Sequence, residues 1–166
     1  MAAVLGCTVH LVYRDAGCVV ATERNLSMAL VLERADVATI RAVEQAYRRT
    51  RQEYAGVIFL ALCSTSSWMP QLSEDLRRAL TNVVATTEDG SLGTALVLSG
   101  SGFANSALRA LFNSLFLVSG SREPLKVFDS RAAAAEWLAE LSQGAGVSWN
   151  PADIVAQTQL LEAAAQ

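Results

Sequence analysis

Seven consecutive apolar residues, Val57 to Cys63, form the clearest hydrophobic pattern in this chain. The run does not alternate with polar residues, and it is bounded by Gly56 and by a stretch rich in serine and threonine. A short run of this kind is typical of a strand covered on both faces, because a strand with one wet face alternates apolar and polar residues. We therefore predict a buried central strand here.

A helical pattern follows this strand. After Pro70, apolar residues recur at the spacing of a helix, and charged residues occupy the opposite side. The apolar positions are Leu72, Leu76, Ala79, Leu80 and Val83. A buried strand, a loop and an amphipathic helix make one unit of a parallel α/β layer.

The flanking segments continue this alternation of predicted strands and helices. Strands are predicted at 8–14, 18–22, 28–33, 94–98 and 125–128, and helices at 36–54, 103–118, 132–141 and 152–165. The segment 28–33 also suits a helix, because Met, Ala, Leu and Glu favour helices. The order predicts an α/β fold with a central mixed, mostly parallel sheet of four to six strands and helices packed on it. We expect a single domain over 1–145, followed by a C-terminal helical tail over 146–166.

The predicted helix from Phe103 to Val118 has little polar surface on any side. A helix that is apolar all round needs cover all round, and a second subunit is one candidate for the second cover. A bound apolar molecule is the other candidate. The residues of this candidate dimer or ligand-wall helix are Phe103, Leu108, Leu111, Phe112, Leu115 and Phe116.

Composition narrows the classes of function. Apolar residues make up 52% of the 166 residues and charged residues 17%, which argues against disorder and favours self-association. The net charge of −3 argues against a nucleic-acid partner, and Arg48, Arg49 and Arg51 are expected to be solvated helix surface. No apolar run is long enough to span a membrane, and the N-terminus lacks the basic start of a signal peptide. The expected location is the cytoplasm.

The cysteines Cys7, Cys18 and Cys63 are odd in number and have no paired spacing. They are expected to be reduced core residues, because neither a disulfide framework nor a zinc site fits such spacing. His10 is the single histidine, and with Cys63 and Asp15 it would form a thiol triad. No nucleophile-elbow pattern surrounds Cys63, so a histidine of the core or of a sheet face is the preferred interpretation. No catalytic residue, metal site or cofactor is expected.

Three segments resemble a known group of domains. The strand TALVLSGSGF, the apolar helix SALRALFNSLFLV and the ending PLKVFDSRAAAAEWL look like the second half of the SpoIIAA-like branch of the STAS superfamily. The resemblance covers about residues 8–141. It implies a sheet of four or five strands with packed helices, and a binding or regulatory role without catalysis. Related folds are similar to the lipid-carrying SEC14 domains.

The loop after the central strand is the first candidate site. Its residues are Ser64, Thr65, Ser66, Ser67 and Trp68. The hydroxyls and the free amides of a helix start suit an anion or a phosphoryl group, and ordinary N-capping explains the same residues. Trp68 is either a partner-binding anchor or an aromatic side chain folded over the sheet edge. The STAS antagonists carry a regulatory serine after an aspartate at this place, and here that aspartate is absent.

The stretch Ser99-Gly100-Ser101-Gly102 is the second candidate site. Its backbone amides would cradle a phosphate, but Asn105 stands where the dinucleotide pattern needs a third glycine. We interpret these glycines as a tight turn.

Three hypotheses for the function remain. The favoured one is a non-enzymatic STAS-like module that binds a protein partner or pairs with itself as a homodimer. The alternative is a carrier of a small apolar molecule or lipid. A hydrolase or transferase that uses Ser64 or Cys63 is the third.

Overall fold

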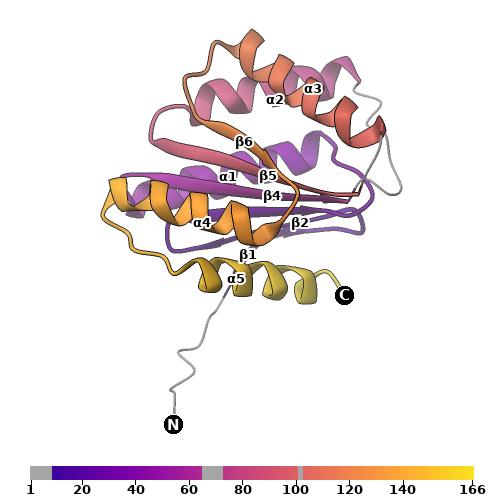
Figure 1. Ribbon diagram of the computed structural model, residues 1–166. Helices are drawn as coiled ribbons and strands as arrows, with labels where there is room; N and C mark the ends of the chain where they lie inside the picture. Colours follow the sequence, from indigo (N-terminus) through magenta and orange to yellow (C-terminus); the bar gives the residue numbers. More distant parts are fainter. Residues whose placement is uncertain (1–8, 65–72, 101–102) are drawn as a thin grey trace.

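The computed structural model describes residues 9–64, 73–100 and 103–166, and these form one layered α/β unit (Figure 1). Six strands make a single sheet in sequence order: β1 (His10–Arg14), β2 (Cys18–Glu23), β3 (Leu26–Val31), β4 (Val57–Ser64), β5 (Ser91–Ser99) and β6 (Leu125–Phe128). The pairs β1–β2 and β2–β3 are antiparallel, and β3 to β6 run parallel. The predicted α/β class with a mixed, mostly parallel sheet is confirmed.

Helices cover both faces of the sheet (Figure 1). One face carries α1 (Val37–Glu53), α2 (Glu74–Thr87) and α3 (Phe103–Ser119). The other carries α4 (Arg131–Ser142) and α5 (Pro151–Ala164), which a short 3-10 turn (Gln143–Ala145) and a loop connect. The three crossover helices all lie on one face, and α4 and α5, which follow β6, cover the other, so the strands β3 to β6 lie between two helical layers.

The strand β4 is the covered central strand that its apolar run predicts. It pairs with β3 on one side and β5 on the other, both in parallel register. Its side chains alternate between the faces: Ile58, Leu60 and Leu62 pack with α4 and α5, whereas Ala61 and Cys63 pack on the side of α1 and α3. Both faces need apolar side chains, which explains why the sequence shows no alternation.

Side-chain caps set the starts of the helices where the sequence predicts them. Asp36 forms a capping box with Thr39 at the start of α1, since its carboxylate accepts from the Thr39 N–H and the Thr39 hydroxyl oxygen accepts from the Asp36 N–H. Asn150 caps α5, with Pro151 as its first residue. Ser130 caps α4.

The third strand differs from its predicted bounds. It runs from Leu26 to Val31, two residues earlier at each end than the segment 28–33, and it is a strand rather than a helix. Glu23 pairs with Leu26, so β2 and β3 join through a tight turn at Arg24 and Asn25. Arg24 has a φ of 51°, a left-handed conformation that tight hairpin turns require.

The C-terminal segment forms α5 and packs on the sheet of its own chain. Ile154 and Leu161 are fully buried in the same core cluster as Met28 and Leu30 of β3. Arg131 of α4 donates to both carboxylate oxygens of Glu162 in α5. The predicted tail is therefore part of the hydrophobic core.

Asn25 joins this C-terminal region to the sheet. Its buried side-chain amide donates to the Gly56 carbonyl oxygen at 3.1 Å and to the Ser142 hydroxyl at 3.0 Å. Its side-chain oxygen accepts from the Trp149 indole N–H at 2.8 Å. One side chain thus satisfies groups from the turn before β4, the end of α4 and the loop before α5.

We predict that Asn25→Ala lowers the free energy of unfolding by about 2–4 kcal/mol, because it leaves the buried Trp149 N–H and the Gly56 carbonyl without their partner. Chemical denaturation followed by tryptophan fluorescence measures this loss. The matched control is Asn82→Ala, which changes an exposed asparagine on α2 and should shift the free energy by less than about 0.5 kcal/mol. Equal losses in the two variants would show that the Asn25 contacts do not stabilise the fold.

Candidate functional site

A cavity of about 150 Å³ lies between the sheet and the helices α1, α2 and α3. Strands β3 to β5 supply its floor, the three helices its walls and roof, and the segment leading into β6 one end. Apolar side chains make up most of the lining. The main ones are Ala29, Val31, Ile40, Val43, Phe59, Ala61, Leu76, Leu80, Val83, Leu96, Leu108, Leu111, Phe112, Phe116 and Leu125.

Unequal side chains on the two faces of the sheet create the space for this cavity. The floor holds the small residues Ala29, Ala61 and Cys63, with the larger Phe59 and Leu96 beside them. The opposite face of β4 holds the larger residues Leu60 and Leu62, which pack closely with α4 and α5. The small residues of the sheet leave space above the strands, and the large side chains of the helices keep the helices at a distance from the sheet.

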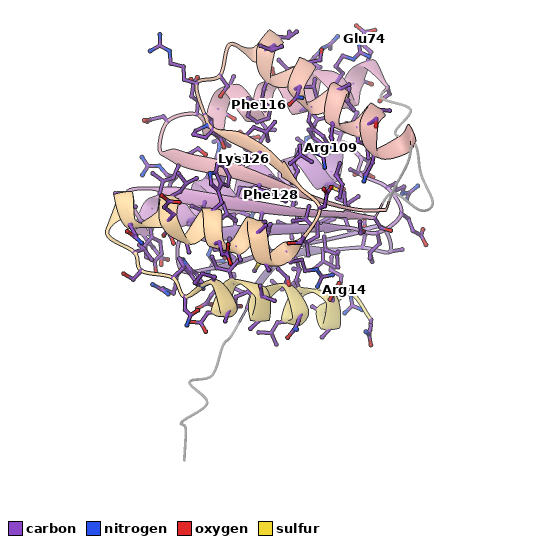
Figure 2. All side chains as sticks on the ribbon, in the orientation of Figure 1. Arg14, Glu74, Arg109, Phe116, Lys126 and Phe128 are labelled. Atoms are coloured by element: carbon purple, nitrogen blue, oxygen red, sulfur yellow. The ribbon has the colours of Figure 1, made fainter. Side chains whose placement is uncertain are left out.

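The helix α3 forms one wall. Figure 2 shows Phe116 on the side of α3 that faces the sheet, where it lines the cavity. Arg109 reaches from the same helix to Asp129, directly after β6, with 2.5 Å between Nη2 and Oδ1. This ion pair is exposed and adds little free energy, but it ties α3 to the end of the edge strand.

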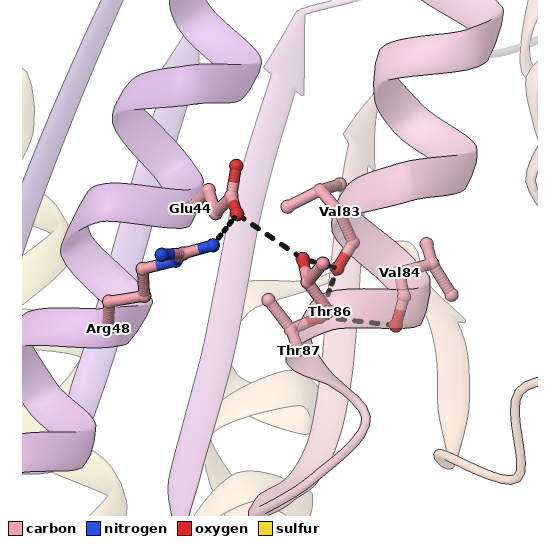
Figure 3. A network of polar contacts seen from close by, with 6 residues as sticks. All are labelled: Glu44, Arg48, Val83, Val84, Thr86 and Thr87. Carbon is pink, nitrogen blue, oxygen red and sulfur yellow. Dashed lines mark hydrogen bonds and ion pairs between the residues drawn. The ribbon is translucent and has the colours of Figure 1, made fainter.

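The helix α2 rests on α1 and α3. A small apolar cluster joins the three helices, with Ile40 from α1, Val83 and Val84 from α2, and Phe116 from α3. Polar contacts extend the α1–α2 junction at the surface (Figure 3). They converge on Glu44, which accepts from Arg48 at 2.6 Å and from the Thr86 hydroxyl at 3.5 Å.

One end of the cavity is polar. Glu123 lines it, just before β6, and its carboxyl group accepts a hydrogen bond from the Thr94 hydroxyl. Burial raises the pKa of the Glu123 carboxyl above its usual range, hydrogen bonds from Ser91 and Thr94 oppose this shift, and the nearby charge of Glu88 adds to it. A half-buried carboxyl group therefore faces a mostly apolar space.

Other polar groups at this end have partners within the protein. The Tyr47 hydroxyl donates to the Asp89 carbonyl oxygen at 2.6 Å, and burial raises the pKa of this phenol to about 12. The Thr87 hydroxyl donates to the Val83 carbonyl oxygen at 2.7 Å (Figure 3). Among the described lining residues, Glu123 is the one with a carboxyl group. A carboxylate accepts about four hydrogen bonds, so the bonds from Ser91 and Thr94 leave it acceptor positions for a ligand.

The residues predicted for the α3 helix have different environments. Leu108, Leu111, Phe112 and Phe116 line the cavity. Leu115 is buried, and the side chain of Phe103 lies outside the described part of the structure. The helix is not covered all round within one chain, because Leu117 is 83% exposed and Val118 76% exposed.

The first predicted loop lies largely outside the described residues, which end at Ser64 and resume at Ser73. Thr65, Ser66, Ser67 and Trp68 are in that gap. Ser64 ends β4 and pairs in register with Ser99 of β5. The carboxyl ends of these parallel strands meet at one edge of the sheet.

The second predicted loop begins as a turn. Gly100 has a φ of 133°, which favours glycine, and its carbonyl oxygen accepts from the Asn105 side chain at 2.6 Å. Ser101 and Gly102 lie outside the described residues. The described part agrees with a tight-turn role.

The structure does not bring the three groups of the thiol triad together. His10 is exposed on the edge strand β1, three strands from β4 and about 14 Å away at the usual strand spacing. Asp15 instead holds the β1–β2 turn, where it accepts from Tyr13 at 2.7 Å and from the Gly17 N–H at 2.7 Å. Burial raises the pKa of the Cys63 thiol to about 12, which leaves very little thiolate at neutral pH.

The predicted basic cluster on α1 is partly engaged in the fold. Arg48 and Arg49 are exposed, as expected for solvated helix surface. Arg51 is half-buried and donates to the carbonyl oxygens of Tyr54 and Ala55 after the helix. Within 9–64, 73–100 and 103–166, no group of three His, Cys, Asp or Glu side chains is placed to hold a metal ion.

The comparisons with known proteins identify no relative. No protein-family model matches the chain, and neither a curated protein nor a solved structure matches it. The resemblance to STAS domains therefore stays an expectation from the sequence segments alone. Among the described helices, none has both the length and the apolar content that crossing a membrane requires.

Sequence reasoning missed Glu123 and the low floor of the cavity. Glu123 stands beside Pro124 in a segment that reads as a solvated turn. The sequence does hold a signal for the floor: after Phe59, Ala61 and Cys63 alternate with Leu60 and Leu62, so the second half of β4 carries smaller side chains on one face.

We predict that the carboxyl group of Glu123 makes folding stability fall as the pH rises. Because the folded-state pKa of Glu123 is raised above its ordinary value of 4.5, the folded protein holds this proton more tightly than the unfolded chain does. Its contribution is fully present below pH 4.5 and is lost as the pH rises through the folded-state pKa. The free energy of unfolding of the wild type relative to Glu123→Gln should therefore decrease with pH over that window, in denaturation series at several pH values.

The control for this series is Glu140→Gln, which changes an exposed glutamate on α4. It reports how much of any slope comes from the exchange of glutamate for glutamine itself. A wild-type advantage over Glu123→Gln that grows with pH would show that the surroundings stabilise the carboxylate and would contradict the prediction.

Proposed function

We propose that the protein is a non-catalytic binding module of the STAS-like type, and that the cavity between the sheet and α1–α3 takes a small apolar molecule. The single observation that supports this proposal most is the cavity itself, with about 150 Å³ and a mainly apolar lining. A mainly apolar cavity of this size accommodates a molecule such as benzene, because most of its lining offers water no hydrogen-bonding partner. The lining thus suits an apolar guest better than solvent.

The chemistry of the lining favours binding over catalysis. A nucleophile needs a base within hydrogen-bonding reach, and the Cys63 thiol has a pKa raised to about 12 by burial. Tyr47 and Thr87 donate their hydroxyl protons to backbone carbonyl oxygens. The lining therefore provides shape and apolar surface, together with one carboxyl group, and these are the properties of a ligand site.

A second candidate is a protein-interaction module that pairs with itself. The observation in its favour is the pair of exposed apolar residues Leu117 and Val118 at the end of α3. A second copy would cover them in a symmetric contact, since homodimers commonly use one self-complementary patch. Sedimentation of the wild type and of Leu117→Ser at micromolar concentration tests this candidate, and a monomeric wild type would remove it.

We predict that benzene binds in the cavity and that Ala61→Phe abolishes this binding. The new phenyl ring rises from the floor into the space that benzene would occupy. At about five times its Kd, benzene should raise the Tm of the wild type by about 2–4 °C and leave the Tm of Ala61→Phe unchanged. Amide chemical shifts should move for lining residues in the wild type.

The matched control is Ala85→Phe, which adds the same ring on the exposed side of α2. This variant should respond to benzene as the wild type does. If benzene shifts neither the Tm nor the lining amides of the wild type, the proposed function is wrong. A response retained in Ala61→Phe would place the binding elsewhere and would equally contradict the proposal.

A further inference from the structure

We infer that Glu123 is the recognition group of the cavity and selects a compact apolar ligand that carries one neutral hydroxyl group. This inference rests on the proposed function, because it names the chemistry of the ligand for the same cavity. It depends on three observations: the position of Glu123 at one end of the lining, the hydrogen bonds it already makes, and the size of the space.

Most polar groups of the lining gather at the end where β5 and β6 begin. Ser91 is the first residue of β5, Thr94 pairs with Leu125 at the start of β6, and Glu123 precedes that strand by two residues. The lining at the opposite end of the strands is mainly apolar, with Val31 from β3 and Leu108 from α3, and the hydroxyl of Thr39 there is bonded to Asp36. A bound molecule with one polar group would therefore place that group at the polar end of the cavity and its apolar part at the other end, so that it lies along the strands.

The carboxyl group of Glu123 keeps capacity for a ligand. Thr94 donates to one of its oxygens, and Ser91 is a second donor. Two donors leave about two of the four acceptor positions of a carboxylate unused. A hydroxyl group of a ligand would fill one of these positions and so satisfy a polar group that faces the cavity.

Charge limits the ligand further. A carboxylate ligand would bring a second negative charge beside Glu123, with Glu88 also near, and no described basic side chain lines the cavity to offset it. An ammonium ligand would have to be stripped of water in an apolar space, and a pair formed there regains little of that cost. Burial raises the pKa of Glu123, which independently favours a neutral partner. A neutral hydroxyl group fits best.

Size sets the class of the apolar body. A volume of about 150 Å³ accommodates one six-membered ring, so phenol is a suitable probe and toluene is its isostere with a methyl group in place of the hydroxyl. The pair isolates the contribution of the hydroxyl group, because the two molecules share the ring and differ only in hydrogen bonding.

Affinities of phenol and toluene for the wild type, Glu123→Leu and Glu123→Gln test the inference, with chemical-shift titrations at pH 7. Glu123→Leu should lower the affinity for phenol about tenfold, which is the contribution of one hydrogen bond to a largely buried acceptor. The affinity for toluene should change by less than about twofold. Glu123→Gln keeps an accepting oxygen and should retain most of the phenol affinity. Benzoate should bind the wild type at least about tenfold more weakly than phenol.

Failure of the inference differs from failure of the proposed function. If toluene does not bind the wild type, the proposed function is wrong. If toluene binds and Glu123→Leu leaves the phenol affinity unchanged, the cavity function stands and the role of Glu123 is wrong.

A measurement on the wild type alone covers the case in which Glu123→Leu does not fold. Nuclear Overhauser contacts should join the ortho protons of phenol to the Thr94 methyl group, and the para proton to the Leu108 methyl groups. The reverse orientation would overturn the role of Glu123.

Discussion

Over the second half of β4, from Leu60 to Cys63, the two faces carry side chains of unequal size, and we relate the cavity to this inequality. Leu60 and Leu62 fill the space under α4, whereas Ala61 and Cys63 on the other face leave space under α2 and α3. Side chains alternate strictly along a strand, so a shift of register by one residue would exchange the two faces. The pairing of β4 with β3 and β5 therefore determines on which side of the sheet the cavity lies.

The floor and the roof of the cavity are supported differently. The floor consists of paired strands, backed by a close-packed core that extends to Ile154 and Leu161 of α5 and is joined to the turn before β4 by Asn25. The roof consists of α2, which rests on α1 and α3 through the cluster around Val83 and Phe116. Strand pairing on both sides makes the floor the more rigid part, and helix packing alone gives α2 more freedom to adjust to a guest.

The sequence predicts the elements well and the cavity poorly. The run from Val57 to Cys63 identifies a covered strand because both of its faces need apolar side chains, and Asp36 identifies the start of α1 through its capping chemistry. The segment 28–33 was placed two residues too late because Arg24 and Asn25 complete a tight turn, so the strand resumes directly at Leu26. Glu123 reads as part of an exposed turn. Hydrophobic periodicity tells which residues are apolar, but not how far apart two apolar layers stand.

The apolar excess of α3 connects the sequence to the cavity. A helix that only packed on a sheet would need one apolar stripe, yet Leu108, Leu111, Phe112 and Phe116 form a wide surface that faces the cavity. Side chains beside an empty space lose part of the dispersion contacts that a packed core provides. A guest of the right shape would restore those contacts, and Glu123 would add one polar contact at the end of β5. A ligand would account for the apolar side chains of α3 that line the cavity, whereas Leu117 and Val118 at the end of the helix stay exposed in the single chain.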